Sequence, residues 1–169
     1  MKLRSPIVAT LGHVDHGKTT LLDRIRRTSV AKREAGGITQ HVGASYITRS
    51  TIEDICGDLL KRFNVTLTVP GLLFIDTPGH EAFVTLRRRG GAVSDLAILV
   101  IDVNQGFQPQ TDESLEILRS YKVPFLVAAT KIDLIPGWRK METTSFLESF
   151  SKQREDCRNI LEEKIYSLV

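Results

Sequence analysis

The sequence has little cysteine and no long apolar run, and these absences exclude several classes of protein. Its 169 residues include two cysteines, Cys56 and Cys157, which are too few and too far apart to indicate a disulfide framework or a zinc cluster. No apolar run is long enough to span a bilayer, and the chain enters a predicted strand without a signal-peptide pattern. We therefore expect a cytoplasmic protein that does not bind membranes.

Aromatic residues are also scarce, at 7%, and neither sign of charge dominates, because a net charge of +3 is only a mild basic excess. The apolar fraction of 41% and the charged fraction of 25% are typical of a soluble globular protein with a sizeable core. Basic residues cluster at 24–27, 32–33 and 87–89, and such clusters are more often solvated helix faces than RNA contacts. The charge is compatible with a nucleic-acid surface but does not indicate one.

Apolar runs alternate with helical patterns through most of the chain. This alternation predicts a doubly wound, mostly parallel α/β sheet with helices on both faces. We predict strands over 7–11, 44–48, 65–69, 72–76, 96–102 and 124–129, the last two of them central. We predict helices over 18–28, 53–63, 81–90, 112–121 and 145–168, and a polar loop over 29–42. Tyr121 and Leu147 are expected to face inward from the last two helices.

Residues 12–19 read Gly-His-Val-Asp-His-Gly-Lys-Thr, a P-loop pattern between a predicted strand and a predicted helix. The backbone N–H groups of such a turn converge on a phosphate, and the helix N-terminus adds partial positive charge. Gly12 and Gly17 allow a tight loop. Lys18 can reach the β- and γ-phosphates, and the Thr19 hydroxyl can ligate Mg²⁺. The segment therefore predicts a site for nucleotide phosphates.

Two further segments suit magnesium and water chemistry. Asp76 begins an Asp-Thr-Pro-Gly sequence after a buried strand, where a carboxylate can hold Mg²⁺ through water and Gly79 can bring its N–H to the γ-phosphate. Thr39, in the polar loop, can complete the Mg²⁺ shell, and His80 can orient an attacking water. Each segment also has a plain interpretation, as a β-turn or an ordinary loop, and the upstream P-loop favours the functional one.

Thr130-Lys131-Ile132-Asp133 follows a predicted strand and suits the recognition of guanine. Asp133 can accept hydrogen bonds from the N1–H and the exocyclic amine of guanine, whereas adenine offers neither. A polar site rejects such a mismatch strongly. The Lys131 stem can cover the base plane. Taken alone, the motif is equally compatible with an aspartate that caps a helix.

These elements, in this order and spacing, resemble a P-loop GTPase. The P-loop and the Asp-Thr-Pro-Gly-His sequence at 76–80 are similar to those of the translational GTPases. Gly-Gly-Ile-Thr-Gln-His-Val-Gly at 36–43 resembles the initiation factor two and five-B branch. Lys-Ile-Asp-Leu-Ile-Pro-Gly-Trp at 131–138 resembles the archaeal and eukaryotic initiation factor five-B. The resemblance covers nearly the whole chain, so residues 1–169 are expected to form one GTP-binding domain that ends before the last guanine motif.

The resemblance implies a role for each matching residue. Residues in contact with the nucleotide would be Asp15, His16, Gly17, Lys18, Thr19, Thr20, Thr39, Gly79, Thr130, Lys131 and Asp133. Thr19 and Thr39 would ligate Mg²⁺, with Asp76 acting through water. Asp15 and the Gly37 carbonyl would bind a monovalent cation, K⁺ or Na⁺. His80 would position the hydrolytic water, and Lys18, Thr39 and Gly79 would complete the catalytic set.

The resemblance further implies a switch that hydrolyses GTP to GDP, slowly alone and faster on the ribosome, in a factor that promotes ribosomal subunit joining. The implied partners are both ribosomal subunits, the ribosomal RNA at their GTPase centre and, through C-terminal domains absent from this chain, initiator tRNA. We expect a monomer. A P-loop ATPase or nucleotide kinase, a signalling module and a tRNA-delivering elongation-type factor stay open as alternatives, although an ATPase would give Asp133 no role.

Thr130 departs from the family, whose guanine motif begins with asparagine. A hydroxyl cannot reproduce the paired donor and acceptor of a carboxamide, so the sequence leaves open both the guanine contact and the tie to the P-loop at this position. Thr130→Asn should therefore bind GDP more tightly than the natural chain. Equal GDP affinities of the two proteins by calorimetry would refute this expectation.

Overall fold

The computed structural model describes residues 3–26, 43–76, 94–143 and 145–168, which contain a five-stranded sheet. Its strands are β1 (Ile7–Leu11), β2 (Gly43–Thr48), β3 (Gly71–Asp76), β4 (Leu96–Asp102) and β5 (Phe125–Thr130). They lie in the order β2-β3-β1-β4-β5, and all pairs are parallel except β2 with β3. The predicted mostly parallel sheet is confirmed.

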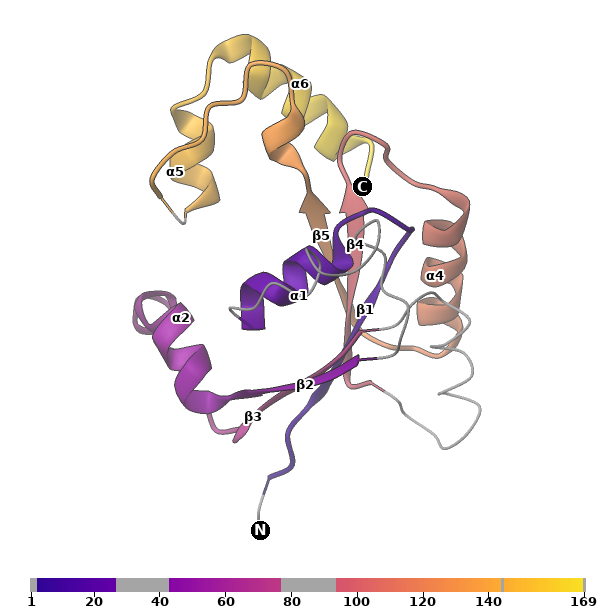
Figure 1. Cartoon of the computed structure of the whole chain (residues 1–169), viewed down its shortest axis with the longest axis vertical. Coiled ribbons are helices and arrows are strands. Elements are labelled where there is room, and N and C mark those ends of the chain that lie inside the picture. Colours follow the sequence, from indigo (N-terminus) through magenta and orange to yellow (C-terminus); the bar gives the residue numbers. More distant parts are fainter. Residues whose placement is uncertain (1–2, 27–42, 77–93, 144, 169) are drawn as a thin grey trace.

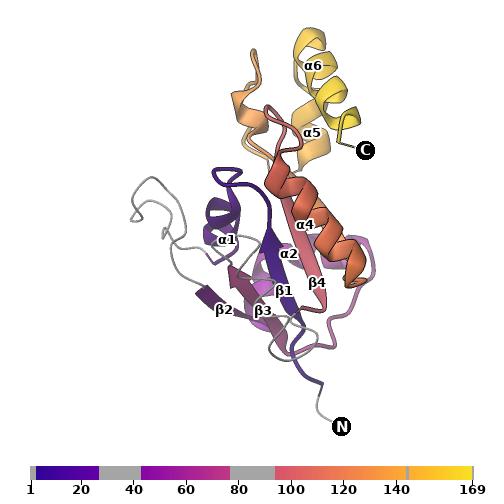
Figure 2. The ribbon, with the colours of Figure 1, turned by 90° about the vertical axis from the view of Figure 1, so that its right-hand side faces the viewer.

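Helices cover both faces of this sheet (Figure 1). The helices are α1 (Lys18–Arg26), α2 (Arg49–Arg62), α4 (Pro109–Ser120), α5 (Phe146–Ser151) and α6 (Glu155–Tyr166). Figure 2 shows α1 and α4 on opposite sides of the sheet, while α5 and α6 lie beyond the carboxyl ends of β4 and β5 (Figure 1). No helix within the described ranges is long and apolar enough to cross a bilayer.

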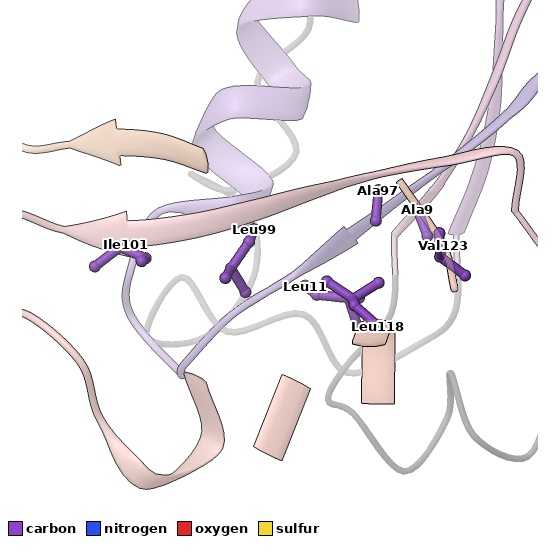
Figure 3. Close-up of a cluster of buried hydrophobic side chains, with 7 residues drawn as sticks. All are labelled: Ala9, Leu11, Ala97, Leu99, Ile101, Leu118 and Val123. Atoms are coloured by element: carbon purple, nitrogen blue, oxygen red, sulfur yellow. The ribbon is translucent and has the colours of Figure 1, made fainter. Parts of the chain in front are cut away.

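Strand side chains alternate between two apolar clusters, one under each layer of helices. On the α4 side, the buried cluster consists of Ala9, Leu11, Ala97, Leu99, Ile101, Leu118 and Val123 (Figure 3). On the α1 side it consists of Val8, Leu22, Ile47 and Phe74. Since both faces are covered, β4 carries an apolar run rather than an alternating one. The two clusters fix the strands whose carboxyl ends carry the candidate site.

Most predicted elements are confirmed, with shifted ends. The helix predicted over 53–63 begins earlier, at Arg49, because the Thr48 hydroxyl accepts a hydrogen bond from the Thr51 N–H and caps the helix. The helix predicted over 112–121 begins at Pro109, a residue suited to a first helical turn. The predicted loop over 29–42 and the predicted helix over 81–90 lie outside the described residues.

The single helix predicted over 145–168 is wrong, because two helices, α5 and α6, occupy this range. At the break, the buried Gln153 side chain accepts from the Arg139 N–H (2.8 Å) and donates to the Arg139 carbonyl (2.8 Å). These contacts hold the turn between the two helices against the backbone of Arg139. Leu147, expected to face the core, is 74% exposed.

Three further expectations are wrong. Residues 65–69 form no strand and lie instead in the connection between α2 and β3. The strand predicted over 124–129 is not central, because no described segment pairs with the outer side of β5. Tyr121 is the C-cap of α4 and follows the last helical residue, so the helical period does not determine which way its side chain faces. It is exposed rather than inward-facing.

Candidate nucleotide-binding site

The P-loop connects the carboxyl end of β1 to α1, and its backbone geometry requires glycine at two positions. Gly12 has φ +138°, and a Cβ there would collide with the Val100 carbonyl of β4. Gly17 has φ +90°, and the exposed Asp15 between them also adopts a positive φ, of 62°. The left-handed residues turn the chain sharply between strand and helix, as a phosphate cradle requires.

Lys18 begins α1, and its side chain folds back into the loop. Its Nζ donates to the carbonyls of Gly12 (2.9 Å) and His13 (2.7 Å). Burial lowers the pKa of Lys18, while the negative charges of Asp76 and Asp15 act in the opposite direction. The loop therefore holds an ammonium group beside the helix N-terminus, where positive charge and backbone donors combine to attract phosphate.

Two residues offer oxygen ligands suited to magnesium, one at the end of β3 and one in the first turn of α1. Asp76 ends β3, is 2% exposed, and accepts a 3.4 Å hydrogen bond from Thr10 of β1. Thr19 is buried in the first turn of α1. Hydroxyl, carboxylate and water oxygens are the ligands that Mg²⁺ prefers, so these residues fit the predicted ion.

The predicted switch residues fall outside the described residues: these are Gly37, Thr39, Gly79 and His80. Of the expected catalytic set, only Lys18 can therefore be placed. The predicted monovalent-cation site is placed only through Asp15, and the predicted magnesium site only through Thr19 and Asp76.

The base motif and the P-loop share one pocket of about 440 Å³. Its lining comes from two segments more than a hundred residues apart in sequence: Gly17, Thr20, Leu21 and Arg24, and Thr130, Lys131, Asp133 and Leu134. All of the residues predicted to read guanine are in this lining, and Gly17 and Thr20 of the phosphate loop are there as well. The pocket therefore brings residues of the P-loop segment and of the predicted guanine motif together on one surface.

The tie between Thr130 and the P-loop, which the sequence left in doubt, is present in the structure. Thr130 Oγ1 lies 2.7 Å from the His16 carbonyl and 3.1 Å from the Ile101 carbonyl, and donates to them. A hydroxyl suffices here because the P-loop presents only an acceptor. The contact of Thr130 with guanine, and the tighter GDP binding of Thr130→Asn, stay predictions.

Thr130→Val should weaken GDP binding about fivefold to tenfold, whereas Thr130→Ser should retain the natural affinity. Valine has the shape of threonine but leaves the His16 carbonyl without its donor, a loss of about 1–1.5 kcal/mol. Calorimetric titration of the three proteins with GDP measures the difference. Equal affinities for the valine and serine variants would show that the hydroxyl does not support the loop.

Gln110 is a contact of the P-loop that the sequence argument missed. Its Oε1 accepts a 3.2 Å hydrogen bond from the Val14 N–H, so the start of α4 also supports the loop. The position of Gln110 in the sequence could have indicated this contact, because a helix that follows β4 begins at the same sheet edge as the loop after β1.

His16 is fully buried beneath the loop. Burial lowers its pKa most, and the charge of His13 lowers it further. The Val100 carbonyl, Asp102 and Gln105 act in the opposite direction and are outweighed. The His16 side chain is therefore neutral in the folded protein. Its backbone forms part of the P-loop, and its side chain is buried below that loop.

The melting temperature should fall by a few degrees as the pH drops below 6.5, the ordinary pKa of histidine. In that window the unfolded chain protonates at His16 and the folded chain does not, so acid favours unfolding. The fall stops once the pH is below the lowered folded pKa. Thermal melts between about pH 8 and pH 5 measure it, and His16→Gln should flatten the dependence. An identical pH profile for the variant would contradict the assignment to His16.

Known proteins similar to the chain include several curated archaeal relatives. It is 62% identical over 167 residues to the probable translation initiation factor IF-2 of Methanopyrus kandleri, and 64% identical over 168 residues to that of Sulfurisphaera tokodaii. These alignments cover 99% of this chain and 28% of each relative. The chain therefore spans little more than a quarter of the length of these proteins.

Solved structures of two translation factors also match the chain. The crystal structure of GDP-bound aIF5B from Aeropyrum pernix matches with a TM-score of 0.83 and 59% identity, over 99% of this chain and 28% of that one. A bacterial selenocysteine-specific elongation factor matches with a TM-score of 0.56 and 29% identity, over 96% and 23%. The family model of the elongation factor Tu GTP-binding domain matches residues 3–167. The chain belongs to the elongation factor Tu GTP-binding domain family.

Proposed function

We propose that this chain is the GTP-binding and GTP-hydrolysing switch domain of a translation initiation factor that promotes the joining of ribosomal subunits. The observation that supports the proposal is the shared pocket, whose lining includes both Gly17 of the P-loop and Asp133. The curated relatives named as initiation factors support the cellular role. We further propose that the 169 residues act as one domain of a longer factor.

Binding would use the described residues in two groups. The P-loop backbone and Lys18 would hold the phosphates, while Asp133 would pair with the guanine edge and Lys131 would cover its plane. Mg²⁺, held by Thr19 and through water by Asp76, would offset the phosphate charge. Phosphoryl transfer of this kind depends mostly on positioning and charge stabilisation rather than on covalent steps.

The switch itself would depend on four residues outside the described ranges. Thr39 and Gly79 would be held by the γ-phosphate and released on hydrolysis, and His80 would position the water. A K⁺ or Na⁺ ion at Asp15 and the Gly37 carbonyl would add charge beside the phosphates. Contact with both ribosomal subunits and their RNA, and a monomeric chain, complete the proposal.

Release of phosphate from GTP, with and without archaeal ribosomes, tests this function. We expect slow turnover by the chain alone, acceleration when both ribosomal subunits are present, and no turnover of ATP. Hydrolysis of ATP at the rate of GTP would instead indicate an ATPase. Guanine nucleotide binding without ribosome-stimulated turnover would instead indicate a signalling module.

A further inference from the structure

A buried carboxylate is paired with a residue that lines the base pocket. Asp102 ends β4 beside Thr130 of β5, with which it is in register, and is 2% exposed. Its Oδ2 is 3.0 Å from the Nζ of Lys131, a residue that lines the pocket. The function assigned to the site gives Asp102 no role of its own, although burying a charge carries a large desolvation cost.

The contacts of Asp102 connect two loops. Its Oδ1 accepts from the Asn104 N–H (2.8 Å) and from Asn104 Nδ2 (3.2 Å), and its Oδ2 accepts from Gln105 Nε2 (3.2 Å). Asn104 Nδ2 also donates to the Lys131 carbonyl (3.0 Å). Burial raises the pKa of Asp102, but hydrogen bonds from Asn104 and Lys131 outweigh it and keep the carboxyl ionised.

Lys131 needs such support, because its backbone is in the left-handed region at φ +58°. This conformation is unfavourable for a residue with a Cβ and persists only when the surroundings fix it. Here the backbone carbonyl is held by Asn104 and the ammonium by Asp102. With both ends fixed, the aliphatic stem is left to form part of the pocket wall.

We propose that Asp102 is the positioning residue for base recognition, holding Lys131 so that its stem covers the bound guanine. The proposal rests on the proposed guanine-nucleotide function. Pairing with Asp102 also neutralises the ammonium, so the base meets an apolar surface rather than a mobile charge. Without the carboxylate, Lys131 can swing into solvent while the P-loop is left in place.

Dissociation of a fluorescent GDP labelled on its ribose tests the proposal. Asp102→Asn should release this ligand about tenfold faster, which corresponds to the loss of a half-buried ion pair. The variant should bind inorganic pyrophosphate as the natural chain does, because pyrophosphate contacts only the P-loop. Glu148→Gln is the matched control, since it removes a carboxylate from an exposed 2.7 Å pair with Lys152, and should change neither value.

A double-mutant cycle tests whether Asp102 acts through Lys131. Lys131→Met should also accelerate release, and adding Asp102→Asn to it should cause no further change. The proposal is overturned if the effects of the two substitutions multiply in the double mutant, if Asp102→Asn weakens pyrophosphate binding as much as it weakens GDP binding, or if it leaves the GDP release rate unchanged.

A second variant serves if Asp102→Asn does not fold. Asn104→Ala removes an exposed side chain that binds the Lys131 carbonyl, and should still speed GDP release about twofold to threefold. No GDP binding by the natural chain would instead overturn the proposed function.

Discussion

Lys18→Ala should lower the affinity for GDP about a hundredfold, with a larger loss for GTP. The lysine ammonium lies inside the P-loop, held by two backbone carbonyls at 2.9 and 2.7 Å, beside the first turn of α1. A charge-assisted contact to phosphate contributes about 1.5–3 kcal/mol, and the γ-phosphate of GTP adds a second contact. Calorimetric titration with each nucleotide measures both losses.

Lys61→Ala is the matched control for this experiment. It removes the same charge from the exposed end of α2, away from the pocket lining, and should leave GDP affinity unchanged. Circular dichroism spectra should show both variants folded. If Lys18→Ala bound GDP as tightly as Lys61→Ala, the P-loop would not be the phosphate site.

Asp133→Asn should reduce GDP affinity about a hundredfold or more and create a preference for xanthosine diphosphate. The carboxylate lines the pocket, where it can accept from the N1–H and the 2-amine of guanine. Asparagine offers one acceptor and one donor, which match the N1–H and the 2-carbonyl of xanthine instead. Competition of the two diphosphates against a fluorescent GDP or xanthosine diphosphate measures the exchange of preference.

Asp112→Asn, an equal change on the exposed first turn of α4, is the control and should keep the natural preference for GDP. Loss of GDP binding by Asp133→Asn without any gain for xanthosine diphosphate would indicate damage to the pocket. An unchanged preference would show that Asp133 does not read the base.

The sequence was sufficient to predict the parts of the site that are contiguous in the chain. The segment from Ile7 to Arg26 specifies a strand, a glycine-bounded turn and a helix, and the structure has these elements in that order. Thr130 ends, and Lys131 to Asp133 follow, a strand that the apolar pattern located to within a residue. Local chemistry and hydrophobic period were enough for both, because each depends on neighbours a few residues away.

The features that the sequence did not predict depend on contacts between distant segments. Gln153 lies at the break in the last predicted helix and pairs with Arg139, a contact between distant segments that no helical period can foresee. The Thr130 hydroxyl replaces an amide because it meets the His16 carbonyl across 114 positions of sequence. Asp102 appears in the sequence as the polar end of an apolar strand, and only the β4–β5 register places it against Lys131.

The pocket also explains how base and phosphate recognition can be coupled. Thr130 joins the base motif to the P-loop through the His16 carbonyl, and Gln110 supports the same loop at Val14. A movement of the base motif at Thr130 would therefore shift the P-loop backbone at His16, and the reverse. The mild effects expected for Thr130→Val and the larger effects expected for Lys18→Ala and Asp133→Asn follow from this division between support and direct contact.

Competition of GDP, GTP and ATP for the natural chain, with a fluorescent GDP as the probe and Mg²⁺ present, tests the central claim most directly. If the pocket joins a phosphate loop to a guanine-reading carboxylate, GDP and GTP displace the probe, and ATP fails to do so even at about a hundredfold excess. Displacement by ATP at the concentrations that suffice for GTP, or no binding of the probe at all, would contradict the account.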